Sequence, residues 1–352
     1  MGASDLALEI TESKSLRIGY CHTPGRKTDS EGCYVMEDML LIRGCFRGRS
    51  NEDLIGVFDG HCGSQMAEYT ARNFHQVLQE ELCLFESLSE EDTQQVANSL
   101  ERQTNFIEID PPCANLSHKR VAWAIHSTFH RITEAIRQLN LEQGEGTTAL
   151  VALFLGPHLY VANVGDTRCV AGKENGDSIR LSVDHRPVNE ERERVERAGG
   201  KVINFSVPRV EGLLAVTRSL GDFDMADKGI IFNPHIKVIE NFRDSISFVT
   251  LATDGLWDLI ADYEAVDVVW TEFTKKSNKP SSTATVASNE PYNLMFDLEE
   301  DEVVSEKTKP CPRLDNALEM QAAKTLVNYV YRRHVLDNVS VVVVSWPSDE
   351  LA

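Results

Sequence analysis

Aspartates recur in this chain where strand-like apolar runs begin or end, and most of them adjoin a glycine. The four positions are Asp59, Asp166, Asp254 and Asp337. Carboxylates are depleted from strands, so this repeated placement needs an explanation. Turn chemistry explains any one of them, because Asp and Gly commonly end strands. Several like charges gathered at one end of a sheet, however, repel one another unless cations neutralise them.

An all-oxygen set of this kind favours Mg²⁺ or Mn²⁺ over zinc. The upstream motif "MED" adds Glu37 and Asp38 beside the apolar run "MLLI". Asp59 is placed to bridge two ions through its two carboxylate oxygens, and Gly60 allows a backbone carbonyl to approach. Two such ions hold a hydroxide at neutral pH and clamp a phosphate for in-line attack. The pattern therefore predicts a two-metal hydrolase site, with the imidazole of His61 next to it.

Charge and cysteine usage narrow the class of protein. The 352 residues carry 55 acidic against 35 basic side chains, a net charge of −20. Such a surface repels nucleic acid and anionic membranes, so we expect neither as a partner. The longest apolar runs, "ALVALFLG" and "VSVVVVSW", are too short to span a bilayer. Scattered cysteines, with no C-x-x-C pair and no secretory signal, favour reduced thiols in a cytosolic or nuclear protein.

Apolar runs separated by turn residues predict the strands and helices that must position these carboxylates. Strands are expected in "NEDLIGVFDG", "SISFVTLATDG" and "NVSVVVVSW", and as three consecutive strands over 147–183 with turns at 156–157 and 174–177. Apolar residues at helical spacing predict helices over 64–82 and 120–140, a short helix capped by Asn189, and helices around 262–273 and 317–334. Strands interleaved with helices favour one layered α/β domain.

The domain plan has three parts. We expect an N-terminal extension at 1–15, a single domain at 16–348 and, within it, a polar and acidic surface insertion at 275–315. The insertion carries "DLEEDEV", which a solvated acidic loop explains, with docking of a partner as the alternative. Nothing in the sequence points to an obligate oligomer, so we expect a monomer.

Nine motifs, in the order of one known family, carry a resemblance that runs from about Leu16 to Trp346. They are "MED", "VFDGHCG", "GTTA", "VANVGDTR", "DHRP", "ERVERAGGKV", "RVEGLLAVTRSLGD", "LATDGLWD" and "LDNVSVVVV". With these motifs the chain resembles the PP2C (PPM) family of metal-dependent serine/threonine protein phosphatases. The resemblance implies an α/β (α+β) fold, in which a central β-sandwich is flanked by helices on both sides and holds its metals at one edge.

The resemblance also implies roles for single residues. Asp59 would bridge two Mn²⁺ or Mg²⁺ ions, and Gly60 would bind one of them through its carbonyl. Asp254 and Asp337 would complete the ligands of one ion. The other carboxylates that would act on these two ions, largely through water, are Glu37 and Asp38.

Asp166, with Asp254 and Asp258, matches the family's third and weaker metal site. His61 matches the residue that acts as general acid and protonates the departing serine or threonine oxygen, a role that suits an imidazole. The implied partners are phosphorylated proteins.

Two positions depart from the family pattern. The family's phosphate-binding arginine is replaced by Cys33. Either the longer preceding loop lets Arg26 or Lys27 reach back to the phosphate, or the anchor is lost, with roughly ten- to a hundred-fold less activity. Cys62 stands in place of a glycine, as a tolerated small side chain or as a thiol prone to oxidative inhibition.

The segment 201–212 falls where the family has a flap beside the active site. Pro208 and Arg209 are the candidate substrate contacts there, and ordinary loop surface is the alternative.

Three functions remain open from the sequence. An active phosphatase is favoured by the complete set of metal carboxylates. A pseudophosphatase, in which the fold serves as a binding or scaffold module, is favoured by Cys33 alone. A hydrolase of small phosphoesters would use the same metal chemistry. A kinase is not supported, because no glycine-rich phosphate loop followed by Lys is present.

Overall fold

The computed structural model describes residues 7–104, 108–111, 115–139, 144–275 and 316–347. Almost all of the expected insertion, with its "DLEEDEV" run, lies outside the described residues.

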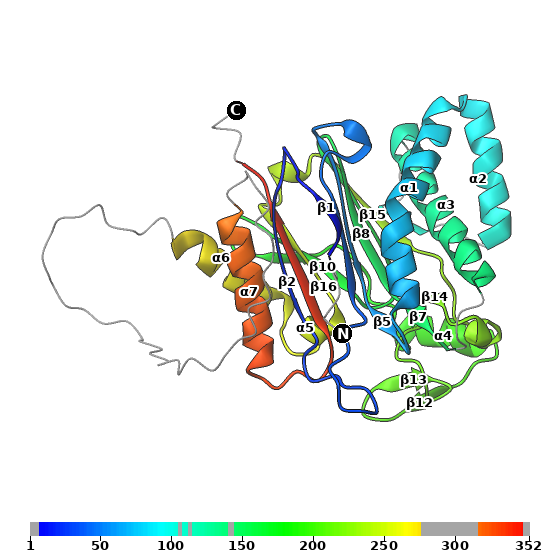
Figure 1. Ribbon diagram of the computed structural model, residues 1–352. Helices are drawn as coiled ribbons and strands as arrows, with labels where there is room; N and C mark the ends of the chain where they lie inside the picture. The colour runs from blue at the N-terminus through cyan, green and yellow to red at the C-terminus, as the bar shows by residue number, and fades with distance from the viewer. Residues whose placement is uncertain (1–6, 105–107, 112–114, 140–143, 276–315, 348–352) are drawn as a thin grey trace, which may run out of the picture.

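Two β-sheets pack face to face and form the centre of the molecule (Figure 1). The seven-stranded sheet has the order β1 (Ala7–Thr11), β3 (Met39–Arg43), β4 (Glu52–Phe58), β8 (Ala149–Leu155), β9 (His158–Val164), β15 (His235–Ile239) and β6 (Glu108–Asp110). The five-stranded sheet has the order β11 (Ser178–Arg180), β10 (Arg168–Gly172), β16 (Phe248–Ala252), β17 (Val339–Ser345) and β2 (Arg17–Thr23).

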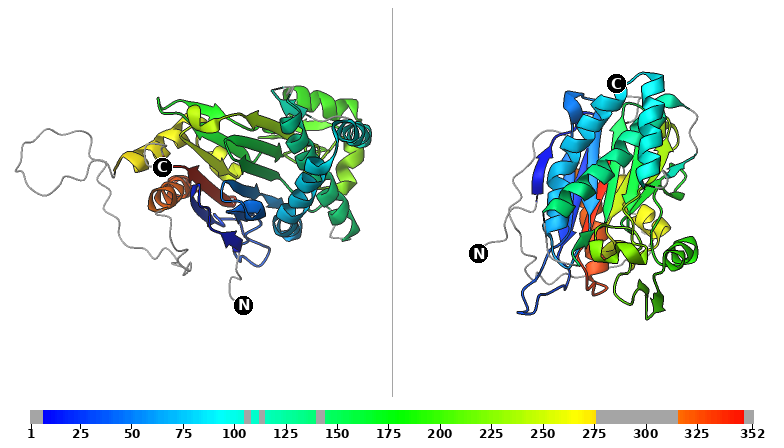
Figure 2. Two further views of the ribbon diagram at one scale, coloured as in Figure 1. Left: turned by 90° about the horizontal axis from the view of Figure 1, so that it is seen from above. Right: turned by 90° about the vertical axis from the view of Figure 1, so that its right-hand side faces the viewer.

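Helices cover the outer face of each sheet, as the views of Figure 2 also show. The seven-stranded sheet is covered by α1 (Gln65–Ser87) and α3 (Leu116–Gln138), with α2 (Glu90–Thr104) outside them. The five-stranded sheet is covered by α6 (Asp262–Lys275) and α7 (Ala317–Tyr331). This layering confirms the predicted β-sandwich flanked by helices on both sides.

Successive side chains of a strand point to opposite faces of its sheet, and both faces of each sheet are covered here. The strand sequences are therefore apolar almost throughout. In β4, Ile55 and Val57 belong to the core between the sheets, whereas Leu54 and Phe58 belong to the core beneath α1 and α3. In β17, alternate valines divide in the same way between the inter-sheet core and the core beneath α6 and α7. Three apolar layers thus fix both sheets firmly.

Smaller elements gather at one edge of the sandwich. A three-stranded sheet joins β14 (Leu220–Gly221), β7 (Gly146–Thr147) and β5 (Gly60–His61). Beside it lie helix α4 (Asn189–Arg197) and the hairpin β12 (Val202–Asn204) with β13 (Pro208–Val210). The remaining short helices are α5 (Asp254–Trp257), η1 (Phe46–Gly48), η2 (Phe223–Lys228) and η3 (Phe242–Asp244).

Three local predictions were wrong or incomplete. The strand expected between the turns at 156–157 and 174–177 is two strands, because the chain leaves the seven-stranded sheet after β9 and enters the five-stranded sheet at β10. Asn189 does not cap α4; it is the first helical residue, with φ of 48°, and Val188 precedes it without a side-chain cap. Helix α2 was not anticipated, because its sequence carries few apolar residues.

Candidate metal centre

Strand ends from both sheets bring the predicted carboxylates to one edge of the sandwich. Asp38 and Asp59 lie side by side, because β3 and β4 are antiparallel with Met39 opposite Phe58. Asp254 follows β16 and Asp337 precedes β17, which is the antiparallel neighbour of β16. The remaining carboxylate, Asp166, lies where the chain crosses between the sheets.

The proximity of these groups is evident in their pKa values. Desolvation raises the pKa of Asp59 well above its ordinary value, and the charges of its carboxylate neighbours raise it further. Those neighbours are Asp38, Asp254, Asp337 and Asp166. Desolvation, reinforced by the charge of Asp337 and opposed by a hydrogen bond from Thr253 and the charge of Lys27, raises the pKa of Asp38 to about 7. The cluster is therefore a site of strong negative potential that favours cations.

Two threonines hold Asp59 in place. The backbone N–H of Asp59 donates to Thr148 Oγ1 at 3.0 Å, and the Thr148 N–H donates to the Asp59 carbonyl at 2.9 Å. Thr148 in turn shares a 2.6 Å hydrogen bond with Thr167, beside Asp166. The motifs "GTTA" and "GDTR" therefore fix the two aspartates relative to each other.

Asn338 organises the other side of the cluster. Its side-chain oxygen accepts from the Glu37 N–H at 2.8 Å, and its side-chain nitrogen donates to the Pro24 and Val35 carbonyls at 3.1 and 2.7 Å. Both ends of the loop 25–34 are thereby tied to the start of β17. Glu37 is buried, and its Oε1 accepts from the Gly63 N–H at 2.7 Å.

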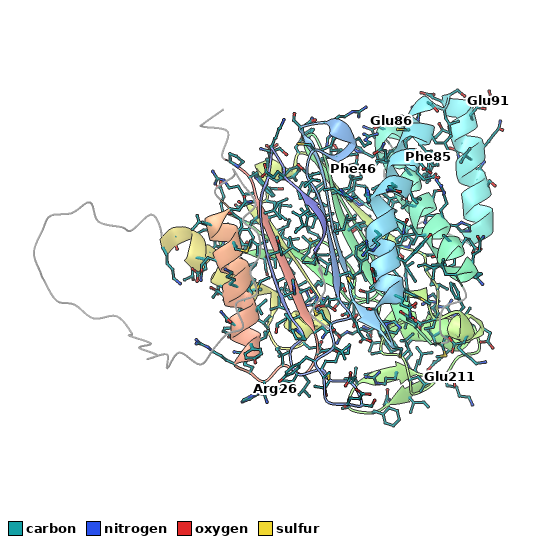
Figure 3. All side chains as sticks on the ribbon, viewed as in Figure 1. Arg26, Phe46, Phe85, Glu86, Glu91 and Glu211 are labelled. Atoms are coloured by element: carbon teal, nitrogen blue, oxygen red, sulfur yellow. The ribbon has the colours of Figure 1, made fainter. Side chains whose placement is uncertain are left out.

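The two basic residues of this loop point to different places. Lys27 Nζ lies 2.8 Å from Glu37 Oε2 and 2.9 Å from Asp337 Oδ1, inside the carboxylate cluster. Arg26 instead contacts His334, with 2.6 Å between Nη2 and Nδ1, at the exposed lower edge of the molecule (Figure 3). Cys33 is exposed in the same loop. Of the two candidate phosphate anchors, only Lys27 lies among the candidate metal ligands.

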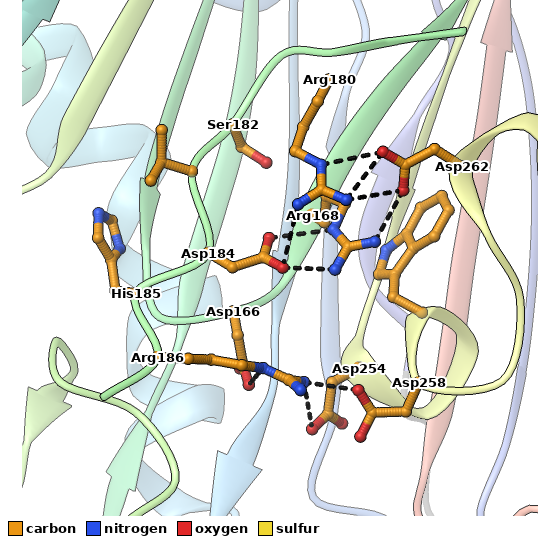
Figure 4. Close-up of polar contacts among 12 residues, drawn as sticks. Asp166, Arg168, Arg180, Ser182, Asp184, His185, Arg186, Asp254, Asp258 and Asp262 are labelled. Carbon is orange, nitrogen blue, oxygen red and sulfur yellow. Dashed lines mark hydrogen bonds and ion pairs between the residues drawn. The ribbon is translucent and has the colours of Figure 1, made fainter. Parts of the chain in front are cut away.

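Arg186 lies among the carboxylates matched to the third metal site (Figure 4). Its Nε is 2.9 Å from Asp166 Oδ2, and its Nη2 is 2.7 Å from Asp258 Oδ1 and 3.6 Å from Asp254 Oδ2. Asp254 and Asp258 are one helical turn apart at the two ends of α5, so both face the same guanidinium.

His61 is held by a buried carboxylate. Its Nε2 lies 2.9 and 3.1 Å from the two oxygens of Asp222, which also accepts from Ser219 Oγ at 2.5 Å. A Cβ on Gly146 would lie 2.2 Å from Asp222 Oδ2 and 2.5 Å from His61 Nε2. The glycine of "GTTA" is therefore required for this pair to form.

The residues of the cluster fit divalent ions of the Mg²⁺ or Mn²⁺ type. Every donor is an oxygen, and Asp38 Oδ1 is buried without a hydrogen-bond partner. Among the described residues, no three His, Cys, Asp or Glu side chains converge closely enough to hold an ion by themselves. Ions at this edge would therefore need water and backbone ligands as well, and Gly60 could supply a carbonyl.

The flap candidates lie on the hairpin β12–β13. Pro208 begins β13, and Arg209 Nη1 donates to the carbonyl of Leu213, the residue that follows the flap, at 2.6 Å. Exposed apolar side chains lie on the flap, at Ile203 and Phe205, and directly after it, at Leu213.

Sequence reasoning assigned no role to Asp222, Asn338 or Arg186, although each lies in a motif that carries the resemblance. Asp222 follows Gly221, as Asp166 follows Gly165, and this Gly-Asp pattern was the available signal. The roles of Asn338 and Arg186 depend on contacts between distant segments, which no local pattern indicates.

Comparisons with known proteins identify the family of this chain. A protein-family model described as "Protein phosphatase 2C" matches residues 16–293. "Probable protein phosphatase 2C 21" of Oryza sativa subsp. japonica is 36% identical over 66% of this chain and 68% of its own length. "Protein phosphatase 1L" of Bos taurus is 32% identical over 72% of this chain and 63% of its own length.

Solved structures share the fold. The serine-threonine phosphatase 2C from Toxoplasma gondii has a TM-score of 0.64 at 19% identity, covering 97% of this chain and 98% of that one. No helix in the described part of the chain has the length and apolar character needed to cross a membrane. From the family model and the similarity to these relatives, the chain belongs to the protein phosphatase 2C family.

Proposed function

We propose that this chain hydrolyses phosphoserine and phosphothreonine in proteins at a binuclear Mg²⁺ or Mn²⁺ centre. The observation that carries the proposal is the gathering of buried, mutually repelling carboxylates at one edge of the sandwich. Asp59 would hold both ions, the Gly60 carbonyl would bind one of them, and Asp254 and Asp337 would complete the ligands of one ion. Glu37 and Asp38 would act through water. When bound, such ions supply an activated water and positive charge for the phosphoryl oxygens.

His61 is the group to which we assign proton donation to the leaving serine or threonine oxygen. Asp222 engages Nε2 and so fixes the ring, which leaves Nδ1 as the nitrogen that carries the transferred proton. Asp222 is a positioning residue in this scheme, because it acts through the imidazole and is itself buried.

Lys27 is the residue that we assign to the phosphate in place of the family's arginine. Its ammonium already lies beside Glu37 and Asp337, where the substrate phosphate must approach the ions. Arg26 is paired with His334 instead. A lysine is a point charge and not a planar fork, so it binds phosphate with less directional specificity than arginine.

The proposal is tested with protein stripped by a chelator, a phosphothreonine peptide and added Mn²⁺ or Mg²⁺. We expect metal-dependent phosphate release by the wild type and none by Asp254→Asn, because that change removes a candidate ligand. Asp227→Asn is the matched control, since exposed Asp227 pairs with Lys228, away from the candidate ligands, and its loss should leave activity unchanged.

Metal binding measured by calorimetry, together with a second substrate, distinguishes the phosphatase from the two alternative functions. Bound metal and an intact fold without turnover would refute the enzyme and favour the pseudophosphatase, with Cys33 as the disabling change. Comparable turnover of phosphopeptide and free phosphoserine would instead favour a hydrolase of small phosphoesters.

A further inference from the structure

Arg186 makes more ion pairs with the candidate metal ligands than any other basic residue in the described part of the chain. Its guanidinium contacts Asp166, Asp254 and Asp258 at 2.9, 3.6 and 2.7 Å (Figure 4). Asp166 is almost fully buried, at 4% side-chain exposure, so its charge depends on a partner inside the protein. A planar fork with several donors can bridge carboxylates that come from different elements.

The backbone around Arg186 holds the guanidinium over this cluster. The N–H of His185 donates to the Gly165 carbonyl at 2.9 Å, and the Gly165 N–H donates to His185 Nδ1 at 3.2 Å. The Thr217 N–H donates to the His185 carbonyl at 2.8 Å. These bonds attach the residue before Arg186 to the residue before Asp166. The ion pair is therefore part of the built structure and not a chance contact of a loose surface side chain.

A divalent ion that used these three carboxylates would have to displace the guanidinium. Three negative groups surround one positive group, so the position attracts further positive charge. The arginine is covalently attached, however, so a dissolved ion has to compete with a cation that is always present at the cluster. Competition between the two cations should weaken ion binding at this position while leaving the ligands of the binuclear centre in place.

We propose that Arg186 is a tethered cation that occupies the third cation position and so limits the number of divalent ions that this chain binds tightly. The inference rests on the proposed metal centre, and it concerns the regulation of that centre by a residue of the chain itself.

The test is a Mn²⁺ titration of metal-free protein, with bound ion counted by calorimetry and by the electron paramagnetic resonance signal of free Mn²⁺. Arg186→Gln should bind one more ion per chain than the wild type, or bind its weakest ion at least about tenfold more tightly. Adding Asp258→Asn to this variant should remove the gain, which locates the extra ion.

Arg180→Gln is the matched control. Arg180 lies nearby and pairs with Asp262 and Asp184, at 2.9 and 3.5 Å, and with none of the three carboxylates that Arg186 contacts (Figure 4). Arg180→Gln removes the same charge as Arg186→Gln but leaves Arg186 in place, so it should bind Mn²⁺ with the same number of ions and the same affinities as the wild type. An equal gain in Arg180→Gln would reduce the effect to net charge and overturn the inference.

The remaining outcomes distinguish a failure of the Arg186 inference from a failure of the proposed metal centre. Unchanged binding in Arg186→Gln, with the tight ions filling normally, would overturn the inference alone. An absence of bound Mn²⁺ in every variant would overturn the metal centre as well. Should Arg186→Gln not fold without metal, Arg186→Lys replaces it. A lysine keeps the charge but lacks the planar fork that reaches carboxylates on different elements, so the weakest ion should bind more tightly than in the wild type, and binding identical to the wild type would overturn the role assigned to the guanidinium.

Discussion

At the scale of single residues, Cys62 shows how a departure from the family pattern is accommodated. It adopts φ of 58°, in the left-handed region that favours glycine, and its side chain is exposed. A side chain in this conformation costs about 1–2 kcal/mol, which the greater freedom of glycine in the unfolded chain partly offsets. The family's glycine at this position is therefore explained by the backbone.

We predict that Cys62→Gly raises the free energy of unfolding by up to about 1 kcal/mol, measured by urea denaturation. Cys83→Gly is the contrast, because Cys83 is exposed within helix α1, where glycine lowers stability. A loss of stability in Cys62→Gly would show that the thiol makes contacts that outweigh the backbone strain.

The loop that replaces the family's phosphate anchor gives a second prediction at this scale. Lys27→Met should lower kcat/KM by roughly ten- to a hundred-fold at saturating metal, because it removes the only cation of the loop that lies in the cluster. Arg26→Met should stay close to the wild type, since Arg26 contacts His334 at the surface. The reverse order of effects would assign the phosphate to Arg26.

At the scale of elements, the small sheet β5–β7–β14 brings His61 and Asp222 together across 161 residues of sequence. Gly146 in β7 is opposite His61 and leaves the space in which the two side chains meet. The placement of His61, the proposed proton donor, thus depends on two-residue strands that pair with one another in this small sheet.

We predict that Gly146→Ala lowers turnover by about a hundred-fold or more while metal binding persists, because the added Cβ forces His61 and Asp222 apart. Gly144→Ala serves as the control: its φ of 81° strains an alanine, so some stability is lost, but a Cβ there meets nothing within 4 Å and leaves His61 and Asp222 in place. Equal losses of activity in the two variants, or a loss of bound metal in Gly146→Ala, would contradict the assignment.

At the scale of the whole molecule, the clustered carboxylates should make stability depend on pH in a way that metal abolishes. The folded chain raises the pKa of Asp59, Asp254 and Asp166, and that of Asp38 to about 7, above an ordinary value of 3.8. The folded state then binds more protons than the unfolded state, so stability falls as the pH rises through this range.

We therefore predict that, in a chelator, the free energy of unfolding is lower at about pH 8 than at about pH 5, and that saturating Mg²⁺ removes most of the difference. Glu191 changes stability with pH in the opposite direction, because its ion pairs with Arg194 and Arg218 outweigh desolvation and hold its pKa well below 4.5. Its contribution is lost only as the pH falls below that value. Greater stability at the higher pH without metal would refute the prediction.

Features of the fold and the candidate site were predicted from the sequence where they depend on neighbouring residues, and were missed where they depend on residues far apart along the chain. The buried strands β4 and β17 follow from unbroken apolar runs, and the carboxylates at their ends follow from local sequence. The passage of the chain between sheets at 165–167 was missed, because both flanking strands are equally apolar. The partners of Arg186 and of His61 were missed because tertiary contacts between distant segments decide them.

The antiparallel pairing of β17 with β2 has a consequence for biosynthesis. β2 lies at the edge of the five-stranded sheet, and its neighbour there is β17. Because β2 is near the start of this sequence and β17 is more than 300 residues further on, β2 emerges from the ribosome long before its partner. Asp337, which directly precedes β17, is made at the same late point. A nascent or prematurely terminated chain would thus lack both the closing strand and one of the carboxylates. It would expose the edges of β2 and β16 to other chains and could not assemble the full candidate metal centre until β17 has been made.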